Sequence, residues 1–97
     1  MILHTLNGAP DSTAFRDCIR LLQTSDALLL MGDGVYTALS DSCACLAIKN
    51  TGAELYLLQP DTAAAGLLTL VDSAFTIVDY QGFAALTERY TTQQAWF

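Results

Sequence analysis

The sequence predicts an α/β fold in which helices cover both faces of a mainly parallel sheet of four or five strands. Short apolar runs divide the chain, and each is followed by a turn signal and then by helix-like spacing. Strands that alternate with helices in this way favour parallel pairing and right-handed crossovers. We therefore expect a three-layer α/β/α sandwich whose strands are drawn from residues 2–6, 27–31, 54–58 and 75–80.

The first strand and helix form the clearest unit. Residues 7–10 break the extended run at 2–6, and Asp11 or Ser12 can cap a helix by accepting hydrogen bonds from its free amides. Apolar residues then recur at spacings of three and four, which is typical of a helix that lays one stripe on a sheet. That stripe consists of Ala14, Phe15, Cys18, Ile19, Leu21 and Leu22.

Two shorter helices are expected in the middle of the chain. The second strand ends in a tight turn at residues 32–34, which leads into residues 35–39 and a polar break. Residues 43–49 could form a helix of one or two turns, closed by Asn50 and Gly52. After the third strand, Pro60 starts a short Ala-rich helix that stops at Gly66.

The last third of the chain adds a strand, a helix and a tail. The run at 75–80 alternates poorly, so we expect a strand that is buried on both faces. Residues 81–90 then predict a helix with one apolar stripe, and the tail at 91–97 predicts a short edge strand.

Composition limits what kind of protein this is. A length of 97 residues fits a single domain, residues 1–97. An apolar share of 53% is high for so small a domain, and we attribute the surplus to an oligomer or complex interface. The 4 basic and 10 acidic residues give a net charge of −6, which opposes direct binding to nucleic acid. No apolar stretch is long enough for a membrane helix, so we expect no membrane contact and a cytoplasmic location.

Three cysteines are the only nucleophiles of note. Cys18 could carry sulfur as a persulfide, but its place in the first helix also fits a small buried side chain that packs on the sheet. Cys43 and Cys45 lack the spacing of a redox motif or a zinc site. If a helix starts at Ser42, its free amides would favour a thiolate at Cys43, although a plain surface turn is the simpler interpretation.

The remaining candidates are weaker. Gly32, Asp33 and Gly34 could form an anion-binding loop, but they lack the third glycine of a dinucleotide site and the lysine of a phosphate loop. The lone His4 suits a structural hydrogen bond better than catalysis. We therefore expect no cofactor and no metal. Trp96 and Phe97 are interface candidates, because large aromatic side chains at a chain end need a surface to pack on.

Several segments, in order, resemble the TusB and DsrH family of small sulfur-relay subunits, and together they span nearly the whole chain. They are ILHTL at 2–6, LLLMGDGVYTAL at 28–39, LYLLQPDTAAAGL at 55–67, IVDYQGFAALT at 77–87 and QAWF at 94–97. The resemblance implies a flavodoxin-like, DsrEFH-like α/β subunit. It also implies a heterohexamer with two paralogous partners, one TusC- or DsrF-like and one TusD- or DsrE-like, although the isolated chain could form a homo-oligomer.

The resemblance leaves three functions open. In the first, the chain is a non-catalytic or auxiliary subunit of a sulfurtransferase complex that passes persulfide sulfur toward 2-thiolation of the tRNA wobble uridine. The relay-competent paralogue carries its cysteine after the third strand, at a place that corresponds here to Leu58 or Gln59. In the second, the chain is a DsrH-type subunit of dissimilatory sulfur oxidation, and Cys18, in the DsrH-like context RDCIRLL, accepts persulfide sulfur directly. In the third, it is a nucleotide-binding or receiver-like module.

Overall fold

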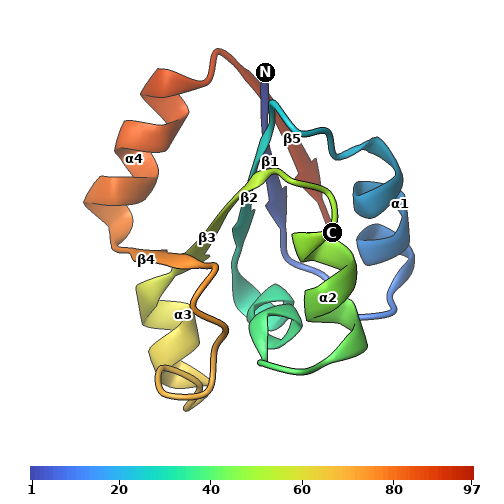
Figure 1. The fold of residues 1–97 in the computed structure, drawn as a ribbon. Coiled ribbons are helices and arrows are strands. Elements are labelled where there is room, and N and C mark those ends of the chain that lie inside the picture. Colours follow the sequence, from blue (N-terminus) through green and yellow to red (C-terminus); the bar gives the residue numbers. More distant parts are fainter.

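The computed structural model describes residues 1–97 and contains one five-stranded sheet in the order β4-β3-β2-β1-β5 (Figure 1). All four strand pairs are parallel, which confirms the expected α/β/α sandwich and its fifth strand in the tail. The strands are β1 (Ile2–Leu6), β2 (Ala27–Leu30), β3 (Glu54–Leu58), β4 (Thr76–Val78) and β5 (Thr92–Trp96).

Five helical segments connect the strands, and three of them begin where a side chain caps the free amides. The segments are α1 (Thr13–Leu21), the 3₁₀ helix η1 (Gly32–Ala38), α2 (Cys43–Lys49), α3 (Gln59–Ala64) and α4 (Tyr80–Arg89). Ser12, Ser42 and Asp79 accept hydrogen bonds from amides in the first turns of α1, α2 and α4. No helix combines the length and apolar character that a bilayer crossing requires.

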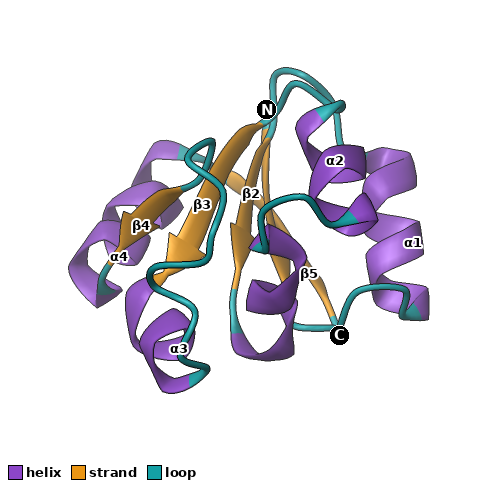
Figure 2. Ribbon diagram, turned by 60° about the horizontal axis from the view of Figure 1, so that its bottom comes forward, coloured by secondary structure: helices purple, strands orange, loops and turns teal.

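The strand order explains which helix covers which face. The chain steps in one direction from β1 to β4, and right-handed crossovers then place α1, η1, α2 and α3 on the same face. The last connection runs back across the sheet to β5, so α4 lies on the opposite face. Figures 1 and 2 show α1 and α2 on one side of the strands and α4 on the other.

The two faces have cores of unequal size. Fifteen buried residues form the larger core under α1, η1 and α2, and five form the smaller core under α4. In β2, Leu28 and Leu30 face the larger core while Ala27 and Leu29 face the smaller one. All four are fully buried, as expected for a central strand of a parallel sheet. Therefore α4 alone covers one face of the sheet, whereas α1, η1, α2 and α3 together cover the other.

Two expectations for local structure were wrong. The run at 75–80 is not buried on both faces, because only Thr76–Val78 pairs, at the edge of the sheet, where Thr76 and Ile77 stay exposed. Residues 32–34 do not make a simple tight turn but open η1. Here Gly34 passes so close to the end of β1 that a Cβ would collide with the carbonyl oxygen of Leu6.

Candidate functional site

The carboxyl ends of β3 and β4 form the crevice where a sheet of this kind usually binds a ligand. The chain leaves β3 toward one face and β4 toward the other, and ligands of open α/β sheets bind where the connections diverge. A hollow of about 490 Å³ lies there. Its lining consists of Gln59, Ile77, Val78, Asp79 and Gly82.

This crevice contains no nucleophile. Leu58 is only 3% exposed, and Gln59 offers an amide where the relay-competent paralogue of the resembled family would carry its cysteine. The carboxylate of Asp79 is engaged in capping α4, since its Oδ1 accepts a 2.8 Å hydrogen bond from the amide of Gly82. The crevice therefore has open space, but its own side chains supply no thiol and no cation.

Cys18 lies inside the larger core and not at a surface. Its side chain is fully buried beneath α1. Burial raises the pKa of the Cys18 thiol to about 12, so the thiolate that would attack a persulfide is scarcely populated. Sulfur could reach this thiol only if α1 moved away from the sheet.

Cys43 and Cys45 have opposite environments although they are two residues apart. Cys43 is exposed beside a groove of about 280 Å³ that Lys49 and Asp72 also line. Cys45 is buried, and burial together with the nearby Asp72 carboxylate raises the pKa of its thiol. The Lys49 ammonium is already paired, at 3.1 Å, with Asp72. Cys43 is thus the exposed thiol of the chain.

The glycine turn at 32–34 is already occupied by a carboxylate of the protein. The amide of Gly32 donates a 2.7 Å hydrogen bond to Asp61, at the start of α3. Asp33 and Asp61 line the shallow hollow between η1 and α3. A phosphate would have to displace one carboxylate and approach a second, so this geometry disfavours the nucleotide-binding hypothesis.

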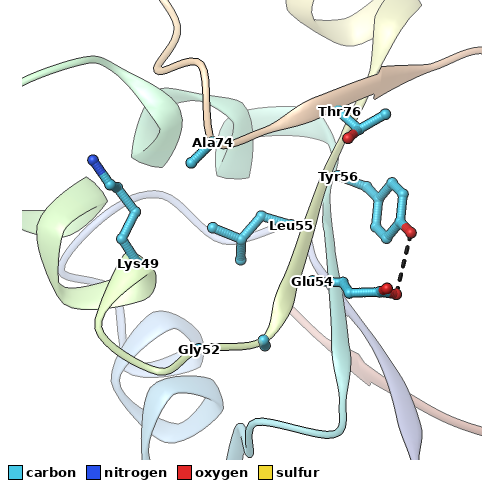
Figure 3. Close-up of a pocket in the computed structure, with 8 residues that line it drawn as sticks. Lys49, Gly52, Glu54, Leu55, Tyr56, Ala74 and Thr76 are labelled. Atoms are coloured by element: carbon cyan, nitrogen blue, oxygen red, sulfur yellow. Dashed lines mark hydrogen bonds between the residues drawn. The ribbon is translucent and has the colours of Figure 1, made fainter.

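Another hollow, of about 390 Å³, lies at the opposite, amino end of β3 (Figure 3). Leu55 points toward Lys49 on one side of the strand, while Glu54 and Tyr56 lie on the other side and share a hydrogen bond of 3.2 Å. Ala74 and Thr76 close the hollow. No thiol lines it, so it offers no place for sulfur chemistry.

Glu54 ties α4 to the sheet at this end. Its carboxylate accepts a 2.7 Å hydrogen bond from Tyr90, and Arg89 contributes at 3.5 Å. The Tyr90 hydroxyl, and next the Arg89 charge, hold the pKa of Glu54 below its usual value. Burial, and next the Glu54 carboxylate, raise the pKa of Tyr90 to about 12. This cluster is structural, because its groups satisfy one another and face no crevice with a nucleophile.

His4, Asp26 and Trp96 are joined although they are far apart in the sequence. His4 Nε2 lies 3.1 Å from Asp26 Oδ2, and Trp96 Nε1 donates to His4 Nδ1 at 3.1 Å. Trp96 packs against the larger core, whereas Phe97 is 88% exposed. Sequence reasoning missed Asp26 and Glu54, since neither lies in a motif and only the sheet brings their partners to them. No three His, Cys, Asp or Glu side chains lie close enough together to hold a metal ion.

The chain matches a protein-family model described as DsrH like protein over residues 9–93. Protein TusB of Escherichia coli (strain K12) is 35% identical to the chain over 95 residues, covering 98% of this chain and all of that protein. Protein TusB of Escherichia fergusonii is 36% identical over the same shares.

Two solved structures share the fold. The ychN protein from E. coli superposes with a TM-score of 0.78 at 19% identity, covering 98% of this chain and 97% of that one. Protein Tm0979 from Thermotoga maritima superposes with a TM-score of 0.69 at 24% identity, covering 92% and 93%. At these identities the likeness concerns the fold alone, and it agrees with the expected architecture.

Proposed function

The chain belongs to the DsrH-like family and is similar to a TusB protein over 98% of its own length, and on that premise we propose that it is an auxiliary subunit of a sulfur-relay complex. Its partners in the proposal are the two paralogous subunits that the family implies, one TusC-like and one TusD-like, in a heterohexamer. The complex passes persulfide sulfur toward 2-thiolation of the tRNA wobble uridine. This chain contributes shape and contact surface, and a partner contributes the reacting cysteine.

One observation carries the auxiliary role: the crevice after β3 has Leu58 and Gln59 where a relay cysteine would stand. The buried Cys18 does not compensate for this loss, because it has no access to the crevice. Cys43 is exposed, but it lies beside the groove at the start of α2 and does not line the crevice. The net charge of −6 further argues that tRNA is bound by other subunits.

The edge strand β5 is the surface that best suits a partner. Thr92, Gln93, Gln94 and Ala95 are all exposed, and residues 91–97 carry no charged side chain that would repel a neighbouring strand. The Trp96 carbonyl accepts from Asn7, so the backbone groups of Gln93 and Ala95 point away from β1. Phe97, 88% exposed beside this edge, adds an apolar contact.

Co-expression with the two paralogous subunits tests the assembly. We expect one complex in size-exclusion chromatography with light scattering. We also expect Phe97→Asp to weaken it, because this change places a charge on the proposed contact. Leu46→Asp is the matched control, since it adds the same charge to an exposed apolar residue on α2. A complex that forms equally well with both variants would exclude this surface, and failure of the wild type to join either paralogue would exclude the proposed function.

The DsrH-type alternative, in which Cys18 accepts sulfur, rests on the family match, because the matched segment includes this residue. In that step the Cys18 thiolate would attack the outer sulfur of a donor persulfide, form a new S–S bond and release the donor thiolate. Mass spectrometry of the assembled complex after exposure to a persulfide donor decides between the two roles. A gain of one sulfur atom on the Cys18 peptide supports direct transfer, and an unchanged peptide supports the auxiliary role.

A further inference from the structure

A chain of hydrogen bonds links the tail of the protein to the start of its central strand. The indole Nε1 of Trp96 lies 3.1 Å from His4 Nδ1, and His4 Nε2 lies 3.1 Å from Asp26 Oδ2. The two rings are nearly parallel, at 12° with centroids 6.3 Å apart. His4 and Asp26 are 1% and 4% exposed, so water hardly competes for these bonds. This series of hydrogen bonds runs from Trp96 on β5 through His4 on β1 to Asp26, the residue before β2.

The chemistry of the donors fixes the protonation state of the imidazole. An indole N–H can only donate, so His4 Nδ1 must be a bare acceptor. His4 Nε2 then carries the single proton and donates it to the Asp26 carboxylate. Asp26 also accepts hydrogen bonds from the amides of Ile2, at 2.9 Å, and Gln23, at 3.0 Å. Burial raises the pKa of Asp26, but the hydrogen bonds from Gln23, His4 and Ile2 outweigh it, so the net pKa is lowered.

We propose that His4 is a protonation-sensitive latch that holds β5 against β1 through Trp96. A second proton on the imidazole must go to Nδ1, where it faces the indole N–H. Two donors then point at each other and the bond to Trp96 is lost, while the bond to Asp26 remains and gains charge. Protonation therefore frees the Trp96 side chain and loosens the end of β5, while the backbone pairing of β5 with β1 and the remaining strands stay in place.

The ionisable groups that face His4 decide whether a second titration could produce the same effect. Asp26 is the charged side chain bonded to it. The larger core on the same face of the sheet includes two titratable side chains, the thiols of Cys18 and Cys45, and the pKa of each is raised, which keeps it neutral. From β5, Gln94 and Trp96 bring no titratable group.

The consequence falls on β5 because of its position. It is an edge strand that pairs with β1 alone, and its first four residues are exposed. Trp96 is the one side chain of β5 that packs into a core. Loss of its hydrogen bond should therefore loosen this strand before any other. If β5 is the docking strand, acid would also weaken assembly, and this last consequence rests on the proposed function.

The isolated chain allows a direct test, because it has one histidine and one tryptophan. Nuclear magnetic resonance can follow His4 Cε1–H and the Trp96 indole N–H in one sample between about pH 8 and about pH 5, the range in which imidazoles change charge. We expect the indole N–H to exchange about tenfold faster once His4 is protonated, with the His4 and Trp96 signals changing together. Circular dichroism should show the helices intact.

His4→Gln is the matched variant. A glutamine carbonyl can accept from the indole and its amide can donate to Asp26, but this pair does not titrate. We expect the variant to keep a slowly exchanging indole N–H at every pH in this range. Three results would exclude the latch. The exchange rate of the indole N–H could be independent of His4 protonation, the His4→Gln variant could keep the pH-dependent rise in that rate, or His4 could become protonated only as the helices unfold.

Discussion

Replacing Cys18 by serine tests whether this residue serves packing or chemistry. The side chain is fully buried in the larger core, among Ala14, Phe15 and Leu22. A serine hydroxyl placed there would lie among apolar side chains and could bond to the carbonyl of Ala14, four residues earlier in α1. A buried hydroxyl without a good hydrogen bond costs about 1–3 kcal/mol.

Alanine at the same position separates size from polarity. It removes one buried heavy atom and adds no polar group, so we expect a loss on the order of 1 kcal/mol. Cys18→Ser should therefore be the less stable variant, although serine is closer to cysteine in size. Against a total of roughly 5–15 kcal/mol for a domain of this size, either change is easily measured by urea unfolding.

Alkylation of the wild type gives the chemical side of this prediction. A pKa of about 12, against 9.0 for an unperturbed thiol, lowers the thiolate population by about a thousandfold. At pH 8 iodoacetamide should modify Cys43 first, and it should reach Cys18 only when urea unfolds the chain. Mass spectrometry of the separated peptides measures each rate.

Two results would refute this reasoning. One is a Cys18→Ser variant as stable as Cys18→Ala, which would mean that the site is polar or open. The other is native-state alkylation of Cys18 as fast as that of Cys43. If the core role and the proposed function are both correct, Cys18→Ala should assemble with the proposed partner subunits and leave their relay of labelled sulfur unchanged.

Three further predictions concern stability. Gly34→Ala should lower the free energy of unfolding in urea by about 1–3 kcal/mol, because its Cβ would overlap the Leu6 carbonyl. Gly66→Ala should lower it by only about 1 kcal/mol, since a Cβ there meets open space although φ is +74°, and equal losses for the two variants would contradict this reasoning. Gln94→Pro should lower the melting temperature far more than Gln93→Pro, since the amide and carbonyl groups of residue 94 point toward β1 and those of residue 93 point outward. The reverse order would show that β5 pairs with β1 in a different register. The free energy of unfolding should fall as pH rises from about 10 to about 12, because the raised pKa of Tyr90 keeps its hydroxyl protonated in the folded chain while the same hydroxyl ionises in the unfolded chain. Tyr90→Phe should make this part of the pH profile flatter.

Much of the fold could be predicted because it depends on local patterns. The spacing of apolar residues in α1 is set by helical geometry, and Ser12 and Ser42 signal helix starts wherever they are placed. The prediction failed at β4, because an apolar run looks the same whether its strand lies in the middle or at the edge of a sheet. Edge position is decided by the other strands.

In the candidate site, too, local features could be predicted from the sequence, whereas contacts between distant residues could not. The absence of a cysteine after β3 could be seen in the sequence once the resemblance fixed the position. The engagement of Asp61 with the amide of Gly32 could not, because it joins residues 29 apart. Nor could the sequence choose between a reactive and a buried Cys18, since both interpretations fit the same helix.

By itself the sequence determined the alternation of strands and helices, the caps, the acidic surface and the family, because these depend on neighbouring residues or on composition. Only the tertiary structure decided that β5 lies beside β1, that α4 alone covers its face, and that Trp96 reaches His4 across 92 residues. The physical reason is that contacts between distant segments are selected by how all elements pack together, and no local pattern contains that information.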